Sequence, residues 1–174
     1  LRVLAETVRL SIGCDSLESV RALPVGLAAL LVEVDCGHHR SGVAACDAGQ
    51  LAARLVAAGH VVRGALTFPG HSYAPGVASA VAAEEAQALV EAGEAMAAAG
   101  VAATELSGGS TPSLAFADSR LTEYRPGVYV FNDAQQWELG VCMPDQVALT
   151  CHARVVSRRA DRVVWPERQW QWAS

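Results

Sequence analysis

The sequence predicts an α/β fold, namely part of a (β/α)8 TIM-type barrel with about five of its eight strands, followed by the start of a β-rich second domain. Short apolar runs alternate with helical patterns, which is typical of parallel strands joined by crossover helices. Polar and Gly-rich loops follow several of the runs, where barrel enzymes carry their sites. After Asp133 the pattern changes to that of antiparallel strands. Composition alone does not separate a barrel from an open doubly wound sheet, but the loops favour the barrel.

Five segments are expected to form the barrel strands because each is short and apolar. The run 28–34 is apolar without interruption until its last residues, as in a strand buried on both faces. The five segments are 8–13, 28–34, 61–68, 102–106 and 127–131.

Three segments are expected to form helices. Residues 15–23 follow the first strand, with Asp15 or Ser16 as the N-cap. Residues 48–58 carry apolar side chains at helical spacing and stop at Gly59. Residues 78–99 are Ala-rich and stop at Gly100, and four acidic residues are placed on the solvent side of this helix: Glu84, Glu85, Glu91 and Glu94.

The C-terminal part breaks the α/β rhythm. Residues 147–157 alternate like an antiparallel strand, and residues 162–165 are the expected hairpin partner. We therefore divide the chain into a partial barrel (1–134), the start of a β domain (135–164) and an atypical tail (165–174) that holds three of the four Trp residues.

Composition excludes several classes of protein. The 174 residues carry a net charge of −5 with 13 Arg and no Lys, and Arg158, Arg159 and Arg162 form only a short basic run, so no nucleic-acid partner is expected. No apolar run is long enough to span a membrane. Five Cys without close pairs indicate reduced thiols and a cytoplasmic protein. The spacing of Cys36, His38 and His39 fits no standard metal site.

A Gly-rich turn after the fourth strand is the first candidate site. In the Ser-Gly-Gly-Ser-Thr segment at 107–111, adjacent glycines allow backbone N–H groups to converge on an anion, and the hydroxyls add donors. The phosphate of a cofactor binds in such late loops of a barrel. A turn that is merely capped by its own hydroxyls explains the same residues equally well.

Charged loops after the second and third strands are further candidates. Arg40 is suited to a phenolate or carboxylate oxygen, although an ion pair with Asp35 would also place it there. His71 is suited to stacking on a flat ring or to moving a proton. A structural, hydrogen-bonded His is the competing interpretation.

Three motifs in one order give the chain a family resemblance. They are Asp-x-Gly-x-x-Arg-x-Gly (35–42), Ser-Gly-Gly-Ser-Thr-Pro (107–112) and Arg-Pro-Gly-x-Tyr-x-Phe-x-Asp (125–133). With them the chain resembles the pyridoxal-phosphate (PLP) enzymes of the alanine racemase barrel type (fold type III), and within these the D-threonine aldolase and D-serine dehydratase group. The resemblance covers residues 2–161.

The resemblance implies a cofactor-binding role for nine residues. It places Arg40 at the phenolic oxygen of PLP, His71 against the pyridine ring and Tyr129 near the pyridine nitrogen, with Arg125 as the competing residue there. The resemblance assigns the phosphate to Gly109, Ser110, Thr111 and the backbone of Gly127 and Val128.

The departures from the family pattern limit the predicted activity. The family's Schiff-base Lys and its divalent metal (Zn or Mn) have no counterparts here, so no catalytic and no metal-binding residue is assigned. We expect a fragment of a PLP-dependent lyase acting on D-3-hydroxy amino acids, inactive alone. A non-catalytic PLP-binding barrel and a racemase-like fragment are the alternatives. The implied partner is a small D-amino acid, and a homodimer is compatible with the family.

Overall fold

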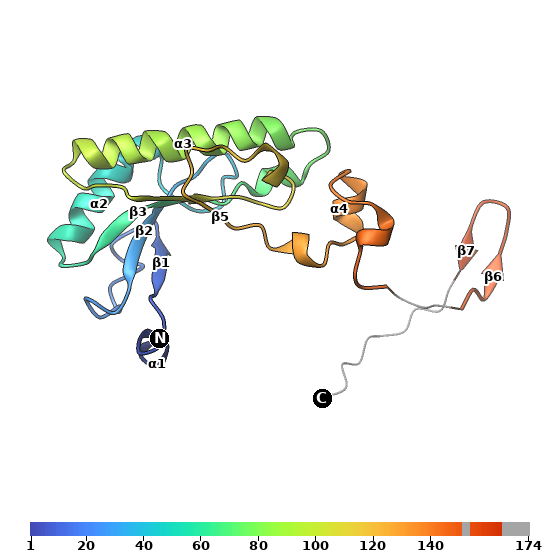
Figure 1. Cartoon of the computed structure of the whole chain (residues 1–174), viewed down its shortest axis with the longest axis horizontal. Coiled ribbons are helices and arrows are strands. Elements are labelled where there is room, and N and C mark those ends of the chain that lie inside the picture. The colour runs from blue at the N-terminus through green and yellow to red at the C-terminus, as the bar shows by residue number, and fades with distance from the viewer. Residues whose placement is uncertain (151–153, 165–174) are drawn as a thin grey trace.

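A five-stranded parallel sheet forms the centre of the computed structural model, which describes residues 1–150 and 154–164 (Figure 1). Each strand pairs in parallel with the strand before it in the chain, so the spatial order is β1-β2-β3-β4-β5. Consecutive parallel pairing is the strand order of a (β/α)8 barrel, and these five strands leave it unclosed. The predicted fold class is confirmed. The strands are β1 (Ser11–Cys14), β2 (Ala29–Glu33), β3 (Val62–Leu66), β4 (Glu105–Gly108) and β5 (Glu123–Tyr124).

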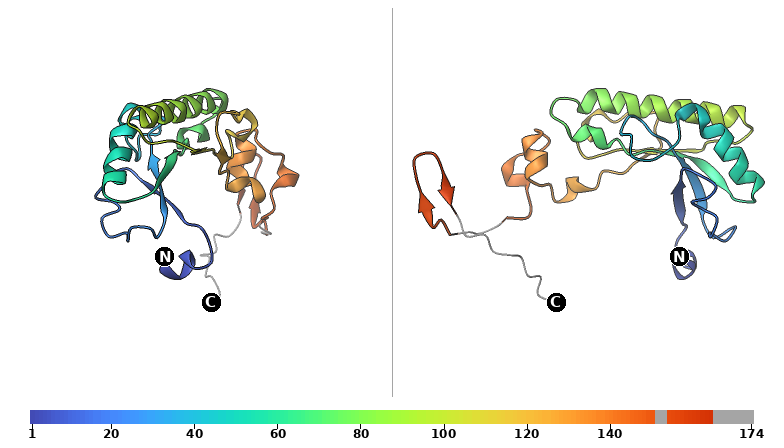
Figure 2. Two further views of the ribbon diagram at one scale, coloured as in Figure 1. Left: turned by 60° about the vertical axis from the view of Figure 1, so that its left-hand side comes forward. Right: turned by 180° about the vertical axis from the view of Figure 1, so that it is seen from behind.

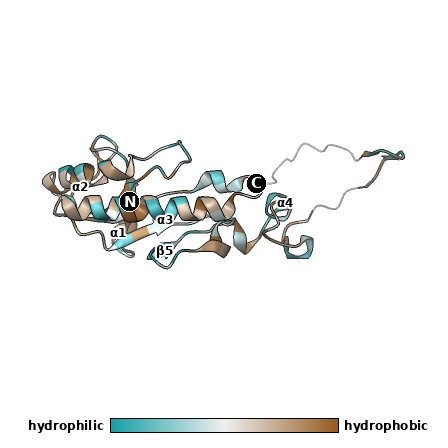
Figure 3. Cartoon of the chain, turned by 90° about the horizontal axis from the view of Figure 1, so that it is seen from above, coloured by the Kyte–Doolittle hydropathy of each residue, from teal (hydrophilic) through white to brown (hydrophobic). Residues whose placement is uncertain are grey.

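Two helices cover one face of the sheet. They are α2 (Ala48–Ala57) and α3 (Ala78–Ala98), which lie on the same side of the strands in all views (Figures 1 and 2). The core between helices and sheet includes fully buried Leu30, Leu55 and Leu89. Figure 3 shows α3 from above as a mostly hydrophobic or neutral helix with hydrophilic turns.

Both helices end where the sequence predicts. Gly59 and Gly100 have positive φ values of 90° and 79°. The residue after each Gly donates its amide back into the last turn, from His60 to the Leu55 carbonyl and from Val101 to the Met96 carbonyl. This pattern is a Schellman motif, which requires the left-handed backbone that Gly adopts without strain.

The opposite face of the sheet carries both apolar and charged residues. The register places Leu31, Gly64 and Glu105 side by side on this face. Arg63 lies 2.7 Å from the Glu105 carboxylate. In a (β/α)8 barrel this face is the interior, which side chains fill.

The prediction of a helix over 15–23 was wrong. The segment folds into successive turns, with amides donated from Arg21 to the Glu18 carbonyl and from Leu23 to the Val20 carbonyl. The Ser16 hydroxyl accepts the Ser19 amide, as an N-cap does, but Pro24 follows Leu23 and disfavours helical backbone before it.

Three predictions of barrel strands need correction. The first strand begins at Ser11, not at Val8, and the fourth begins at Glu105, not at Ala102. The prediction of a strand over 127–131 was wrong: β5 lies earlier, and residues Val128–Val130 form a 3-10 turn. Pro126 has no N–H for a ladder, and the Val128 amide is donated to the Thr111 side chain.

The segment after β5 extends away from the sheet (Figure 1). It contains α4 (Ala134–Glu138) and the antiparallel hairpin of β6 (Ser157–Arg158) and β7 (Val163–Val164). The hairpin confirms the expected partner segment. Of the strand predicted over 147–157, only Ser157 lies in a strand. Residues 147–150 and 154–156 belong to none, although the Val156 amide donates to the Val164 carbonyl. Its middle, 151–153, and the predicted Trp-rich tail, 165–174, lie outside the described residues.

The remaining short elements lie before β1 or in the connections between the elements already described. They are helix α1 and five 3-10 turns: Arg2–Ala5, Ala45–Asp47, Gly70–Tyr73, Leu114–Phe116, Val128–Val130 and Pro144–Gln146. Among the residues that the structure describes, no helix combines the length and apolar character needed to cross a bilayer.

Candidate functional site

The loops that follow β2, β3, β4 and β5 meet at one edge of the sheet. Parallel strands present their carboxyl ends on the same side, which brings these loops together. Direct contacts join them: the Ser72 hydroxyl lies 2.8 Å from the Ser110 hydroxyl, and Arg125 donates to the Thr67 carbonyl at 2.6 Å. The edge therefore gathers most of the residues predicted from the sequence.

The Gly-rich turn after β4 is held by three buried serines. The Ser110 hydroxyl lies 2.9 Å from the Ser113 hydroxyl and 2.8 Å from that of Ser72. The Ser110 amide donates to the Ser113 side chain. All three serines are at most 1% exposed. Ser110 was assigned to a phosphate from the sequence, and here its hydroxyl belongs to the contacts that fix the turn.

Gly109 adopts a backbone conformation that excludes a side chain. Its φ is +100°, and a Cβ atom there would lie 2.5 Å from Cδ1 of Tyr124 and 2.9 Å from the Arg125 amide. The turn therefore requires Gly for both its dihedral angle and its close approach to β5.

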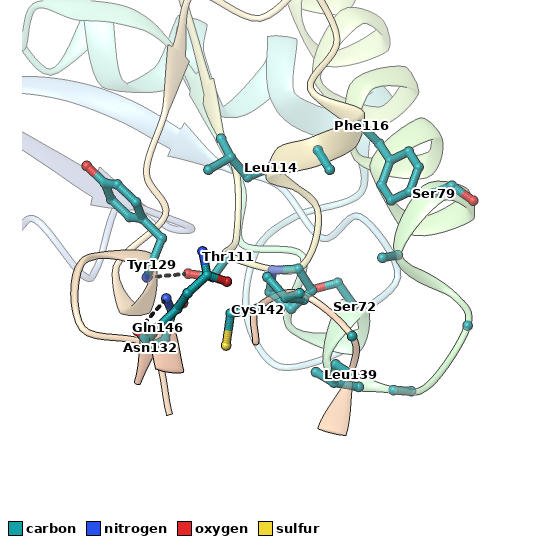
Figure 4. Close-up of a pocket in the computed structure, with 17 residues that line it drawn as sticks. Ser72, Ser79, Thr111, Leu114, Phe116, Tyr129, Asn132, Leu139, Cys142 and Gln146 are labelled. Atoms are coloured by element: carbon teal, nitrogen blue, oxygen red, sulfur yellow. Dashed lines mark hydrogen bonds between the residues drawn. The ribbon is translucent and has the colours of Figure 1, made fainter. Parts of the chain in front are cut away.

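Thr111 joins the Gly-rich turn to the segment after β5. Its Oγ1 accepts two backbone amides, from Val128 at 3.1 Å and from Tyr129 at 3.2 Å. Figure 4 shows the Tyr129 contact as a dashed line. Since both lone pairs of the hydroxyl are used, its proton is available for an acceptor outside. Thr111, Val128 and Tyr129 were all assigned to the cofactor, and the structure brings them together beside Gly127.

We expect Thr111→Ala to lower the free energy of unfolding by about 0.5–2 kcal/mol, because two partly buried amides lose their acceptor. Thr111→Ser keeps the hydroxyl and is expected to retain most of the stability. Urea denaturation of the three proteins measures the difference. Equal losses in both variants would mean that the methyl group, not the hydroxyl, stabilises the contact.

Arg125 points along the strand ends. Its Nε donates to the Ser107 hydroxyl at 2.8 Å, and the Ser107 hydroxyl donates to Glu123 at 2.9 Å. Together with its bond to the Thr67 carbonyl, these contacts fix the guanidinium across β3, β4 and β5. A guanidinium held in this way is preorganised for a ring nitrogen or an anion.

Arg40 and His71 form a separate group on the β2 and β3 loops. The guanidinium of Arg40 lies 5.0 Å from the centre of the Phe68 ring. His71 bonds Glu84 at 3.0 Å and stacks on His38 with ring centres 6.3 Å apart. Its Nδ1 is buried without a partner among the described residues. His71 is therefore fixed at one ring nitrogen and free at the other.

The alternative ion pair of Asp35 with Arg40 is not formed. Asp35 instead accepts the amides of Gly37 and His39, both at 2.9 Å, and the His39 ring at 2.8 Å. Burial alone would raise the pKa of Asp35, but these hydrogen bonds outweigh it and lower the pKa to about 2. The hydrogen bonds of Asp35 thus fix the backbone of its own loop. Arg40 packs on the Phe68 ring instead of pairing with Asp35.

Asp35 is expected to make stability depend on pH. Its folded pKa of about 2 lies below the ordinary 3.8, so its contribution is full above pH 3.8 and is lost as the pH falls toward 2. Asp35→Asn keeps an acceptor for the two amides and removes the charge. We expect the variant to be less stable at pH 6 and the gap to narrow toward pH 2 in urea denaturation. A gap that stays constant would contradict this assignment.

One residue of the site was missed. Glu85 was placed on the solvent side of its helix, and this was wrong: it is 0% exposed. Its carboxylate accepts the Gly109 amide and lies under the Gly-rich turn. The signal was present in the spacing, because Glu85 is four residues from Val81 and four from Leu89, both buried.

A pocket of about 560 Å3 adjoins the turn (Figure 4). It includes Ser72, Thr111 and Tyr129, and continues to Asn132 before α4 and to Cys142 and Gln146 after it. Arg40, His71, Arg125 and Gly109 do not line it. The pocket thus touches only the Thr111 end of the predicted site. Within the described part of the chain, no group of three or more His, Cys, Asp or Glu side chains is arranged to hold a metal ion.

Comparison with protein families decides the relationship. The model of the alanine racemase N-terminal domain matches residues 1–135. The chain belongs to the alanine racemase N-terminal domain family. The match includes Arg40, His71, the Gly-rich turn and the Tyr129 segment, so the family recognised from three sequence motifs is confirmed.

Two relatives of the chain are named as dehydratases. D-threo-3-hydroxyaspartate dehydratase of Delftia sp. HT23 is 42% identical over 140 residues, which cover 75% of this chain and 37% of the relative. Its solved structure superimposes with a TM-score of 0.78 over 91% of this chain and 46% of that chain, at 32% identity. D-serine dehydratase of Dictyostelium discoideum is 28% identical over 154 residues, covering 80% of this chain and 38% of the relative.

A third relative carries out a different reaction. The structure of D-threonine aldolase from Filomicrobium marinum superimposes with a TM-score of 0.67 at 25% identity, over 91% of this chain and 47% of that chain. The chain spans less than half the length of all three of these relatives.

Proposed function

We propose that this chain provides the PLP-binding barrel part of a lyase acting on D-3-hydroxy amino acids. The relatives support the substrate class, since two are named as dehydratases and one as an aldolase of such compounds. The observation that carries the proposal is the Thr111 hydroxyl, which gathers the Val128 and Tyr129 amides beside the serine-held turn. Hydroxyl and amide donors at a late barrel loop are typical of a phosphate site.

The residues present fit the phosphate end of PLP. Thr111 would donate its free hydroxyl proton, and the Gly127 amide would add a backbone donor, because the Val128 and Tyr129 amides already donate to Thr111 Oγ1. His71 and Arg40 would lie along the ring, with Arg125 or Tyr129 at its nitrogen. When bound, PLP supplies an electron sink for bond cleavage at the amino acid's α carbon. The role of this chain is then to bind and orient the cofactor.

The covalent anchor does not fit these residues. The chain contains no Lys, and an Arg does not release the proton needed for an imine. No residue of this chain is proposed as a ligand of a divalent metal, although one solved structure of a D-threo-3-hydroxyaspartate dehydratase variant is described as a metal-free form. We therefore propose that the residues of this chain hold the cofactor without forming the bond to it.

Reduction with borohydride tests this part of the proposal. After incubation with PLP and reduction, we expect no stoichiometric adduct at any internal residue, because only the α-amino group is able to condense. Peptide mapping by mass spectrometry locates any label. A stoichiometric phosphopyridoxyl group on an internal side chain would contradict the proposal.

A non-catalytic PLP-binding barrel is the second candidate, and the absence of Lys favours it. Equilibrium dialysis with PLP and with pyridoxal, which lacks the phosphate, tests binding for both candidates. We expect saturable, reversible binding of PLP and weaker binding of pyridoxal. Equal affinity for the two compounds would refute the phosphate site and with it both candidate functions.

A further inference from the structure

Glu85 is a buried carboxylate that none of the roles above uses. It lies on the core side of α3, is 0% exposed, and accepts the Gly109 amide. A Cβ atom at Gly108 would collide with the same carboxylate. The second carboxylate oxygen, Oε2, is buried without a partner among the described residues. The Gly-Gly pair, which suggested an anion nest from the sequence, is therefore also the feature that admits this carboxylate.

The titratable groups that interact with Glu85 come from the β5 segment and from the loops after β2 and β3; they are Arg125, Tyr124, Cys36 and His71. Burial raises the pKa of Glu85 above its ordinary value. The Gly109 hydrogen bond, the Arg125 guanidinium and the His71 ring offset only part of this increase. On its own helix, the adjacent Glu84 bonds His71. Glu85 thus interacts with the turn through the Gly109 amide, and with the charges of Arg125 and His71, two residues proposed to contact the cofactor.

A buried carboxylate is costly unless its contacts compensate it. An apolar side chain at this point of α3 would continue the stripe formed by Val81 and Leu89 without that cost. A carboxylate at this buried position is explained if it maintains a backbone geometry that the site requires, despite the free-energy cost of its burial.

We propose that Glu85 is a positioning residue, whose buried carboxylate fixes the Gly108–Gly109 turn so that Thr111 presents its hydroxyl to the phosphate of a pyridoxal-type ligand. The inference rests on the proposed function. Glu85 acts through the Gly109 amide and does not touch the ligand. Its carboxylate joins the turn to α3. The hydroxyls of Ser72, Ser110 and Ser113 join the turn to the loop after β3.

Three variants of the full chain separate the contributions of Glu85. Glu85→Gln keeps an oxygen that accepts the Gly109 amide, and Glu85→Ala removes it. Glu91→Gln is the matched control, because Glu91 is exposed on the same helix. The readout is the ratio of the dissociation constants for pyridoxal and PLP from equilibrium dialysis, with thermal unfolding as the check on folding.

We expect Glu85→Ala to reduce the preference for PLP about tenfold or more, as for a lost hydrogen bond to a charged group. Glu85→Gln should retain most of the preference, and Glu91→Gln all of it. A folded Glu85→Ala protein with the preference of the unchanged chain would overturn the role of Glu85. No preference in the unchanged chain would instead refute the proposed function, and the inference with it.

The Gly109 amide gives a second readout in case Glu85→Ala does not fold. In a pH titration of the unchanged chain followed by NMR, its proton shift should move with the protonation of Glu85 and should not move in Glu85→Gln. A Gly109 shift that does not respond to pH in the unchanged chain, or that responds equally in Glu85→Gln, would contradict the proposal.

Discussion

Completing this chain with the remaining segments of the Delftia dehydratase is expected to give activity on D-3-hydroxy amino acids, whereas the chain alone should show none. The chain covers 37% of that relative and has no Lys, so the rest of the enzyme would supply the bond to the cofactor. Product analysis separates the two reactions. A dehydratase releases ammonia and a 2-oxo acid, and an aldolase releases an aldehyde and glycine or another amino acid.

Two variants of this completed enzyme are expected to behave differently. Thr111→Ala should weaken cofactor affinity by about 2- to 30-fold, and saturating PLP should restore much of the rate. Arg40→Ala should lower kcat even at saturating PLP, if Arg40 holds the phenolic oxygen of the ring. An unchanged kcat in Arg40→Ala would mean that Arg40 only packs on Phe68, as its 5.0 Å distance from that ring allows.

Replacing Gly109 with Ala is expected to produce the largest loss of stability among single changes at the site, about 2–5 kcal/mol. The left-handed backbone at φ +100° costs about 1–2 kcal/mol for a side-chain-bearing residue, and overpacking against Tyr124 and the Arg125 amide adds about 1–3 kcal/mol. Phosphate-selective binding should be lost as well, because the turn moves.

Gly100→Ala is the matched control for this prediction. Its φ is +79°, but a Cβ atom there would meet nothing within 4 Å. It should therefore lose only the backbone contribution, about 1–2 kcal/mol. Denaturant unfolding of both variants isolates the steric part, and equal losses would show that Gly109 is required for its dihedral angle alone.

The elements predicted well from the sequence are those with a buried apolar pattern and a clear stop. Strand β2 is a run of apolar residues, and helices α2 and α3 end at Gly59 and Gly100. The elements predicted poorly are short and polar. Strand β5 has two residues, and hydrogen bonds to side chains decide the backbone after it, as Thr111 does at Val128. Such contacts are not visible in local sequence.

The sequence predicted which loops lie together better than it predicted the contacts within those loops. The loops after successive strands do meet, because parallel strands share one edge. The partners within the loops depend on tertiary packing, and the sequence alone did not place Ser72 against Ser110 or Glu85 beneath Gly109. In α3, the many Ala residues obscured which face was buried, and Glu85 was assigned to solvent for that reason.

NMR mapping of PLP on the unchanged chain tests the central claim most directly. As PLP is titrated, the amides of Gly109, Thr111, Val128 and Tyr129 should shift together, and pyridoxal at the same concentration should shift them much less. Shifts confined to the far end of the pocket, at Asn132 and Cys142, would contradict the assignment of the phosphate to Thr111 and its neighbouring amides. So would equal shifts with both compounds.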